Sequence, residues 1–277
     1  MANWISTTQL SNEQRLDVLG LLNRTDAALG REAIDEASRR SVVHGWPSEH
    51  WLAHENERLI NYAICSSSAN TTLEMCGGGF DQSLLQEVLA KHESIQWWHR
   101  DPSIIATGKV IRTLQLLRIK LPVPVIETPI GSVLRTFDSS TDKEAWLNQN
   151  NAAFADHPDQ GAWHISDLEN RIEEPWFDPS GFLLLEFNGV LGASCWTKVH
   201  ELHPDRSGEI YVISVDPSFQ GRNLGRIMVT QGLDSLRKKG VTNAILFVDE
   251  TNEAARKLYE TLGFTLIRED KLVLFTN

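Results

Sequence analysis

The segment at residues 220–226 reads Gln-Gly-Arg-Asn-Leu-Gly-Arg and carries residue types that can bind a phosphate group. Its two glycines, Gly221 and Gly225, let the backbone approach a ligand closely. The segment leads into a predicted helix, whose first N–H groups have no partner inside the helix and form the positive end of its dipole. Arg222 and Arg226 add full positive charge. The spacing therefore predicts a phosphate site, against the plainer alternative of a strand–turn–helix corner.

Other common phosphate-binding motifs do not fit this segment. A P-loop requires G-x-x-x-x-G-K-S/T and a dinucleotide site requires G-x-G-x-x-G, and the chain has neither. The segment instead resembles the Q/R-x-x-G-x-G/A loop of GNAT-type N-acetyltransferases, which implies acyl-CoA binding. His50 and His54 have a spacing that zinc ligands adopt on a helix, but the glutamate of H-E-x-x-H and a third ligand are missing. We therefore expect no metal.

The elements around the phosphate segment form a strand–helix pattern. A buried strand at residues 209–215 precedes it, and a helix at 224–239 follows and is closed by Gly240. Next come a strand at 244–248, a helix that starts at 251–252 and ends at Gly263, and two strands at 264–267 and 272–275. Upstream, strands at 181–187 and 190–199 flank Asn-Gly, which suits a type I′ turn and predicts a hairpin.

The first half of the chain carries a weaker version of the same order. We expect a short strand, a helix from Ser11, a polar helix at 26–40, strands at 58–65 and 71–76, and a helix at 82–91. A strand at 95–98 and a helix at 104–119 follow, and Pro-rich residues 121–125 form an extended connector. The pattern predicts an α+β protein of two tandem GNAT-like domains, a degenerate 1–125 and a catalytic 130–277. Each has a central, mostly antiparallel mixed sheet flanked by helices.

Composition restricts the function classes. The chain has 277 residues, 41% hydrophobic and 23% charged, as in an ordinary globular protein. The net charge of −11 argues against nucleic acid or an anionic membrane as a partner. Three cysteines without a C-x-x-C pair suggest reduced thiols in a cytoplasm. We expect no signal peptide and no transmembrane helix, because the first residues lack a basic and apolar leader pattern and no run of 18 apolar residues occurs. A cytoplasmic monomer acting on a small molecule is expected.

Several longer segments resemble one family within the GNAT group. Residues 252–264 follow the GNAT element N-x-x-A-x-x-x-Y-x-x-x-G-F. Four others, at 150–163, 176–181, 196–200 and 208–217, resemble the mycothiol synthase family, tandem GNAT proteins of actinobacteria. The resemblance covers most of 130–277 and is faint over 1–125. It implies that acetyl-CoA acetylates the cysteine amine of cysteinyl-glucosaminyl-inositol, the last step of mycothiol biosynthesis, in the C-terminal domain.

The resemblance also implies site residues. Substrate contacts fall on Asp159, Lys198 and Glu209, with Glu32 as the best match to an acidic residue on the second helix of the N-terminal domain. Phe247 stands where the family often has Tyr, so one hydroxyl contact is absent. The N-terminal domain lacks the phosphate loop, so CoA should bind there weakly or not at all. Implied cofactor contacts fall on Ile213, Ser214 and Val215, on Gln220, Gly221, Arg222, Asn223, Leu224, Gly225 and Arg226, and on Asn252, Glu253, Ala254, Ala255, Arg256 and Lys257.

Two side chains are candidates for the chemistry. An α-amino group has a pKa of roughly 7.7–8, so a carboxylate acting through a water can serve as its base. Glu209 is the candidate base, with a salt bridge at the sheet edge as its alternative. Tyr259 can protonate the leaving thiolate, with core packing as its alternative. A backbone N–H near Ile213 to Val215, where the strand splays, can stabilise the oxyanion.

Two other functions remain open at this point. The chain could be a GNAT enzyme that acetylates another small amine or a protein N-terminus. It could also be a non-catalytic acyl-CoA sensor, although Glu209, Tyr259 and the phosphate loop argue against that.

Overall fold

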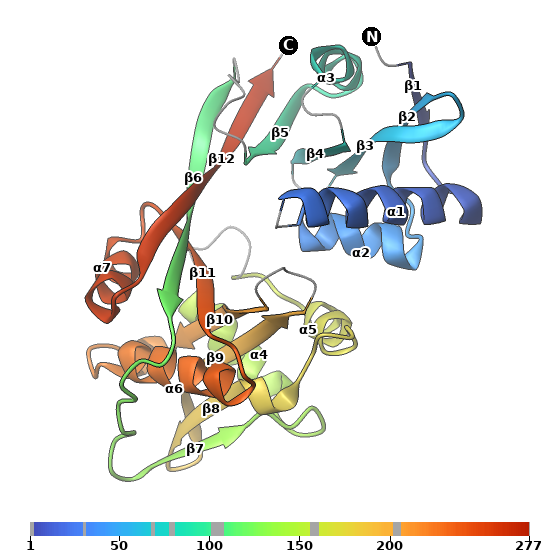
Figure 1. Cartoon of the computed structure of the whole chain (residues 1–277). Helices are drawn as coiled ribbons and strands as arrows, with labels where there is room; N and C mark the ends of the chain where they lie inside the picture. The colour runs from blue at the N-terminus through green and yellow to red at the C-terminus, as the bar shows by residue number, and fades with distance from the viewer. Residues whose placement is uncertain are drawn as a thin grey trace. The chain divides into compact units, whose positions relative to one another are not determined.

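The computed structural model describes residues 3–29, 32–67, 70–77, 81–100, 108–155, 161–201 and 206–276 (Figure 1). The chain forms two compact units, one of Met1–Gln115 with Arg268–Asn277 and one of Leu116–Ile267. Strands β6 (Lys109–Lys120) and β12 (Thr265–Thr276) contribute residues to both units. The division by compactness thus lies upstream of the expected connector, and the C-terminal residues belong to the first unit. The functional division into 1–125 and 130–277 stays a prediction.

The first unit is built on a sheet with helices on both faces. Its strands follow the order β1 (Trp4–Thr7), β2 (Glu49–Glu55), β3 (Arg58–Ser67), β4 (Thr71–Gly77), β5 (Ser94–His99), β12 and β6. Neighbours from β1 to β4 are antiparallel, and β4 pairs with β5 in parallel. Helices α1 (Asn12–Leu29) and α2 (Glu36–His44) pack their apolar side chains on one face, and α3 (Gln82–Leu89) packs on the other.

The second unit repeats this plan with a longer set of elements. Its strand order is β12, β6, β11 (Asn243–Asp249), β10 (Ser207–Val215), β9 (Val190–His200), β8 (Phe182–Phe187) and β7 (Ser132–Thr136). Helices α4 (Lys143–Ala153) and α5 (Ile165–Ile172) cover one face over an aromatic cluster. Helices α6 (Leu224–Lys238) and α7 (Glu253–Leu262) cover the other face over an aliphatic cluster. Short 3₁₀ turns, η1 (Pro179–Gly181) and η2 (Pro217–Phe219), lead into β8 and out of β10.

Two local features explain how the second unit holds α6 and the β8–β9 hairpin. A Cβ added at Gly232 would lie 2.5 Å from Cys195 Sγ, so the missing side chain lets α6 pack directly on β9. The predicted hairpin is confirmed, because Asn188 and Gly189 both have positive φ, 51° and 79°, as a type I′ turn requires. These features place β9, β10 and α6 in the arrangement on which the candidate site depends.

Three predicted elements were wrong, and the strand that carries His50 and His54 was not predicted. The helix at 104–119 is the strand β6 over its described part, because its apolar residues fit a strand paired on both sides as well as a helix. The helix at 26–40 is divided: α1 runs to Leu29, and Asp35 starts α2 by accepting a hydrogen bond from the Ser38 N–H. The two last strands are one strand, β12. The pair His50 and His54 lies on a strand, where His50 is buried and hydrogen-bonds Tyr62.

Candidate active site

The segment at residues 220–226 leaves the N-terminus of α6 open. Asn223 is the N-cap residue, with φ 60° and ψ 17°, and its side chain makes no capping hydrogen bond. Asn223 stands at the first glycine position of the Q/R-x-x-G-x-G/A pattern, and asparagine tolerates this left-handed conformation better than other residues with a Cβ. Since no side chain among the described residues accepts from the first-turn N–H groups, they can bind an anion.

The surroundings of this helix end also suit a polyanion. Gly221 has φ +77°, and a Cβ built there would meet no atom within 4 Å, so the backbone is open to a ligand. Arg222 is exposed, with its guanidinium carbon 4.8 Å from the centroid of the Phe219 ring. Arg226 donates to the Thr261 hydroxyl. The helix dipole and the exposed Arg222 therefore favour an anion at this helix end, and these groups fit a pyrophosphate, whereas the Arg226 side chain is engaged by α7.

Strand β10 places Glu209 beside two groups from β9. Glu209 pairs with Lys198 in the antiparallel β9–β10 register, so both side chains lie on one face of the sheet. His200, two residues further along β9, projects from the same face. Its Nε2 lies 2.7 Å from Glu209 Oε2, and each side chain is 11% exposed. The predicted residues Glu209 and Lys198 thus come together, and His200 joins them.

Beyond Glu209, strands β10 and β11 separate. Their parallel register covers only Gly208–Ala244 and Glu209–Ile245, within a stretch of chain that the structure describes completely. On the other side of β10, a bulge leaves Tyr211 unpaired between Ile210 and Val212. The predicted divergence of the strand is therefore present. It leaves β10 backbone groups on the β11 side without a strand partner, which is the arrangement that an oxyanion donor needs.

Ser214 has its side chain engaged inside the protein. Its Oγ donates to Gln149 Oε1 at 2.8 Å and lies 2.8 Å from Ser194 Oγ, which accepts from Trp146 Nε1 at 3.0 Å. This network faces α4, away from the aliphatic cluster that contacts Ile213 and Val215. Any contact of Ser214 with a ligand in the β10–β11 gap would therefore use its backbone.

Two aromatic side chains lie beside Lys198. The Lys198 Nζ lies 4.6 Å from the centroid of Trp176 and 5.7 Å from that of Tyr211. The Tyr211 hydroxyl accepts a hydrogen bond from Arg171 Nε at 3.0 Å, and the Arg171 guanidinium stacks 3.9 Å from the Trp163 centroid. Two cations and two half-buried rings thus border the face that carries Glu209. Such a surface suits a ligand with many hydroxyl groups.

Tyr259 lies in the aliphatic cluster, on α7. It is 7% exposed, and its ring packs edge-on against Phe264 at 5.6 Å. Burial, with a smaller effect from the Cys195 thiol, raises the pKa of the phenol well above its usual value. The hydroxyl makes no hydrogen bond with another described residue, although a buried tyrosine normally has such a partner. The phenol is thus a protonated donor with unused hydrogen-bonding capacity.

The other predicted residues are less informative. Asp159 lies outside the described residues. Glu32 precedes α2, whose own acidic residue is Glu36, paired with Arg40 at 2.8 Å. Phe247 is 42% exposed on β11, two residues beyond the partner of Glu209. The α7 positions 252–257 form the start of a helix that Asn252 caps by accepting from the Ala255 N–H.

Sequence reasoning did not single out His200, Tyr211, Trp176 or Arg171. Three of them lie within segments that carry the family resemblance, but their roles depend on the register of β9 against β10 and on the bulge. Only the two-residue spacing of Lys198 and His200 gave a local signal, since alternate residues of a strand share a face.

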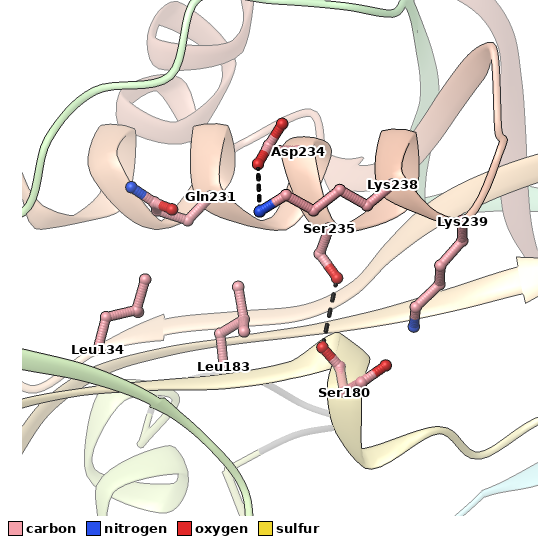
Figure 2. Close-up of a pocket in the computed structure, with 8 residues that line it drawn as sticks. All are labelled: Leu134, Ser180, Leu183, Gln231, Asp234, Ser235, Lys238 and Lys239. Atoms are coloured by element: carbon pink, nitrogen blue, oxygen red, sulfur yellow. Dashed lines mark hydrogen bonds and ion pairs between the residues drawn. The ribbon is translucent and has the colours of Figure 1, made fainter.

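A separate hollow lies between the C-terminal half of α6 and strands β7 and β8. It has a volume of about 380 Å³ and is lined by Leu134, Ser180, Leu183, Gln231, Asp234, Ser235, Lys238 and Lys239 (Figure 2). Lys238 pairs with Asp234 at 2.9 Å, and Lys239 pairs with Asp178 at 2.7 Å. The hollow is therefore at the opposite end of α6 from the phosphate segment, and its lysines already have acidic partners.

Comparisons with known proteins place this site in a family. The Acetyltransferase (GNAT) family profile matches residues 144–264. The mycothiol acetyltransferase of Geodermatophilus obscurus is 48% identical over 90% of this chain and 90% of its own length. That of Thermobispora bispora is 38% identical over 90% of this chain and 91% of its own. The chain belongs to the mycothiol acetyltransferase family. The resemblance seen in the sequence is thereby confirmed, and with it an acyltransferase activity.

Solved structures agree on the fold of this family member. A GCN5-related N-acetyltransferase from Sphaerobacter thermophilus has a TM-score of 0.70 at 18% identity, covering 99% of this chain and 95% of that one. A tandem GNAT protein from the clavulanic acid biosynthesis pathway also has a TM-score of 0.70, at 13% identity, with 99% and 98% covered. The predicted tandem GNAT fold of the α+β class is confirmed. Among the described residues, no helix is long and apolar enough to cross a membrane, and no acidic, His or Cys cluster could hold a metal.

Proposed function

We propose that this chain transfers the acetyl group of acetyl-CoA to the cysteine amine of cysteinyl-glucosaminyl-inositol, giving mycothiol. The observation that carries the proposal is the near-full-length identity to mycothiol acetyltransferases, from 35% to 48% in three relatives. The open N-terminus of α6 supports a pyrophosphate-containing donor, because its N–H groups and Arg222 offer an anion site.

The reaction exchanges a carbon–sulfur bond for a carbon–nitrogen bond. The amine nitrogen attacks the thioester carbonyl, one proton leaves the nitrogen, and one proton ends on the CoA sulfur. Glu209 is proposed to accept the first proton, directly or through a water, because its carboxylate lies where β10 and β11 begin to separate. Tyr259 is proposed to donate the second, since its phenol stays protonated and has no hydrogen-bond partner among the described residues.

The tetrahedral intermediate needs a hydrogen-bond donor for its oxyanion. Backbone N–H groups of β10 near Ile213 to Val215 are proposed for this role, because β11 has left the register by then. Fixed donors of this kind stabilise charge without reorganisation, and removing one typically costs about 100- to 1,000-fold in kcat.

The acceptor is proposed to bind over the face that carries Lys198, Trp176 and Tyr211. An ammonium and aromatic rings side by side can hold the hydroxyls and the C–H faces of a sugar–inositol acceptor. Asp159 and Glu32 stay proposed contacts that rest on the family resemblance. Phe247 is proposed to line the acceptor side without a hydroxyl contact.

A direct assay tests the proposed function. Purified protein is incubated with acetyl-CoA and cysteinyl-glucosaminyl-inositol, and the acetylated product is followed by mass spectrometry, because the substrate thiol interferes with thiol reagents. The product should still react with a thiol-alkylating reagent, which distinguishes N-acetylation from S-acetylation. A peptide with a free N-terminus serves as the competing acceptor. Turnover on the peptide with none on the cysteinyl compound would contradict the proposal.

A further inference from the structure

The contact between His200 and Glu209 joins two strands at the point where the amine must be deprotonated. His200 Nε2 lies 2.7 Å from Glu209 Oε2, within the range of a charge-assisted hydrogen bond. Both side chains are 11% exposed, so water screens this contact only partly. When Glu209 is ionised it has no proton to donate, so in that state the imidazole donates from its Nε2–H.

The fold fixes this contact through backbone pairing. Glu209 is in register with Lys198, and His200 is the next residue of β9 on the same face. Diagonal neighbours of an antiparallel pair are within reach of long side chains. The two residues of β9 that flank the Glu209 carboxylate have different contacts. The Lys198 ammonium lies over the Trp176 ring, whereas the His200 imidazole contacts the carboxylate itself.

We propose that His200 is a positioning residue for acetyl transfer: its Nε2–H holds one oxygen of Glu209 so that the carboxylate faces the acceptor amine. The proposal rests on the proposed role of Glu209 as the base. A carboxylate attached at one oxygen has a defined direction for the other, and small errors in placing a reacting group cost up to about 100-fold in rate. His200 touches neither the amine nor acetyl-CoA and acts through Glu209.

Two substitutions of His200 form a matched pair. His200→Gln keeps an N–H donor near the position of Nε2, whereas the shorter side chain of His200→Asn cannot reach Glu209. We expect His200→Asn to lower kcat about 10- to 100-fold with KM for acetyl-CoA within about twofold. His200→Gln should recover kcat to within about fivefold of the unchanged protein. If the Gln variant is as slow as the Asn variant, the hydrogen bond is not what matters, and the proposal is wrong.

A double-mutant cycle separates this proposal from the role of Glu209. In a Glu209→Gln background, His200→Asn should have little further effect on kcat, because the group that it positions is gone. An equal loss in both backgrounds would overturn the proposal. If Glu209→Gln alone leaves kcat unchanged, the base assignment fails instead, which is a different result. Thermal unfolding and acetyl-CoA binding are measured on each variant and identify any variant that has lost its fold. His200→Ala then replaces that variant in the comparison.

Discussion

The residues around Glu209 show how a strand pair can set a carboxylate in place before the reaction. Lys198 lies across the ladder, His200 lies on the diagonal, and the bulge at Tyr211 brings an aromatic ring to the same side. The contact with His200 and the burial of both side chains restrict the Glu209 rotamers before the acceptor binds. A carboxylate held in this way stabilises the transition state better than a carboxylate that is free in water, because it does not have to reorient during the reaction.

The proposed proton-donor role of the Tyr259 phenol can be tested by a single substitution. Because burial raises its pKa, the donor form should persist through the whole range in which the enzyme is assayed. We expect Tyr259→Phe to lower kcat about 100-fold or more, with the KM for acetyl-CoA nearly unchanged, since the ring still packs against Phe264. Steady-state kinetics with a parallel binding assay measure both. Loss of acetyl-CoA binding with retained kcat at saturation would assign Tyr259 to packing instead.

His50 predicts a pH dependence of stability. Burial lowers its pKa to about 4, from about 6.5 in the unfolded chain. The folded state therefore resists protonation that the unfolded state accepts, and stability falls as pH drops from about 6.5 to 4, by roughly 3 kcal/mol. We expect urea unfolding of the first unit to show this loss. The variant His50→Asn, which can still face the Tyr62 hydroxyl, should lose the acid-side slope; an unchanged slope would contradict the assignment.

The two units differ at the N-termini of helices α3 and α6. The N-terminus of α6 has no side-chain cap, whereas Asp81 caps α3 by accepting from the Ser83 N–H at 2.9 Å and from Trp4 Nε1 at 3.0 Å. A carboxylate at the start of α3 both uses the N–H groups and repels a phosphate. The corresponding positions of two similar units thus have opposite electrostatic character.

This contrast predicts one acetyl-CoA per chain. Equilibrium dialysis should give a stoichiometry of about one, with the site at α6. Asn223→Asp places a like charge beside the pyrophosphate and should weaken binding about tenfold or more. Asp81→Asn is the matched control at α3 and should leave the affinity unchanged. A stoichiometry of two, or an effect of Asp81→Asn on affinity, would show that the first unit also binds the donor.

Elements with a local signal could be predicted from the sequence. Asn188-Gly189 set the β8–β9 hairpin, and Gly263, at φ 96°, ends α7 as expected. The strand β6 was mistaken for a helix because its stability comes from β12 and β11, which lie far away in the sequence. The contact between His200 and Glu209 was not predicted for a similar reason, because no local sequence pattern indicates which residues of two strands come into register.

Each of the two units has hydrophobic clusters of its own. Among the described residues, two hydrophobic clusters draw only on the first unit and two only on the second. The family resemblance was strong over 130–277 and faint over 1–125, which agrees with an intact phosphate segment in the second unit only. Separate cores predict that each unit can lose stability by itself, even though β6 and β12 continue through both.

The pair Glu74 and Arg100 tests this independence. Arg100 contacts Glu74 at 2.5 Å and 3.2 Å, inside the first unit, and the Glu74 side chain is 1% exposed. Arg100→Ala leaves a buried carboxyl without its cation and should lower the unfolding free energy of that unit by about 3–5 kcal/mol. Replacing both residues, as Arg100→Met with Glu74→Leu, should restore part of it, because the apolar pair needs no partner, whereas the Ala33 carbonyl still loses the Arg100 donor.

Hydrogen exchange resolved by segment measures where the loss falls. With Arg100→Ala, protection should decrease in β2 to β5 and remain in β8 to β10 and in α6. Acetyl-CoA binding at α6 should then survive, since the groups that form that site belong to the second unit. An equal loss of protection in both units would mean that β6 and β12 transmit the change, and that the chain folds as one cooperative body.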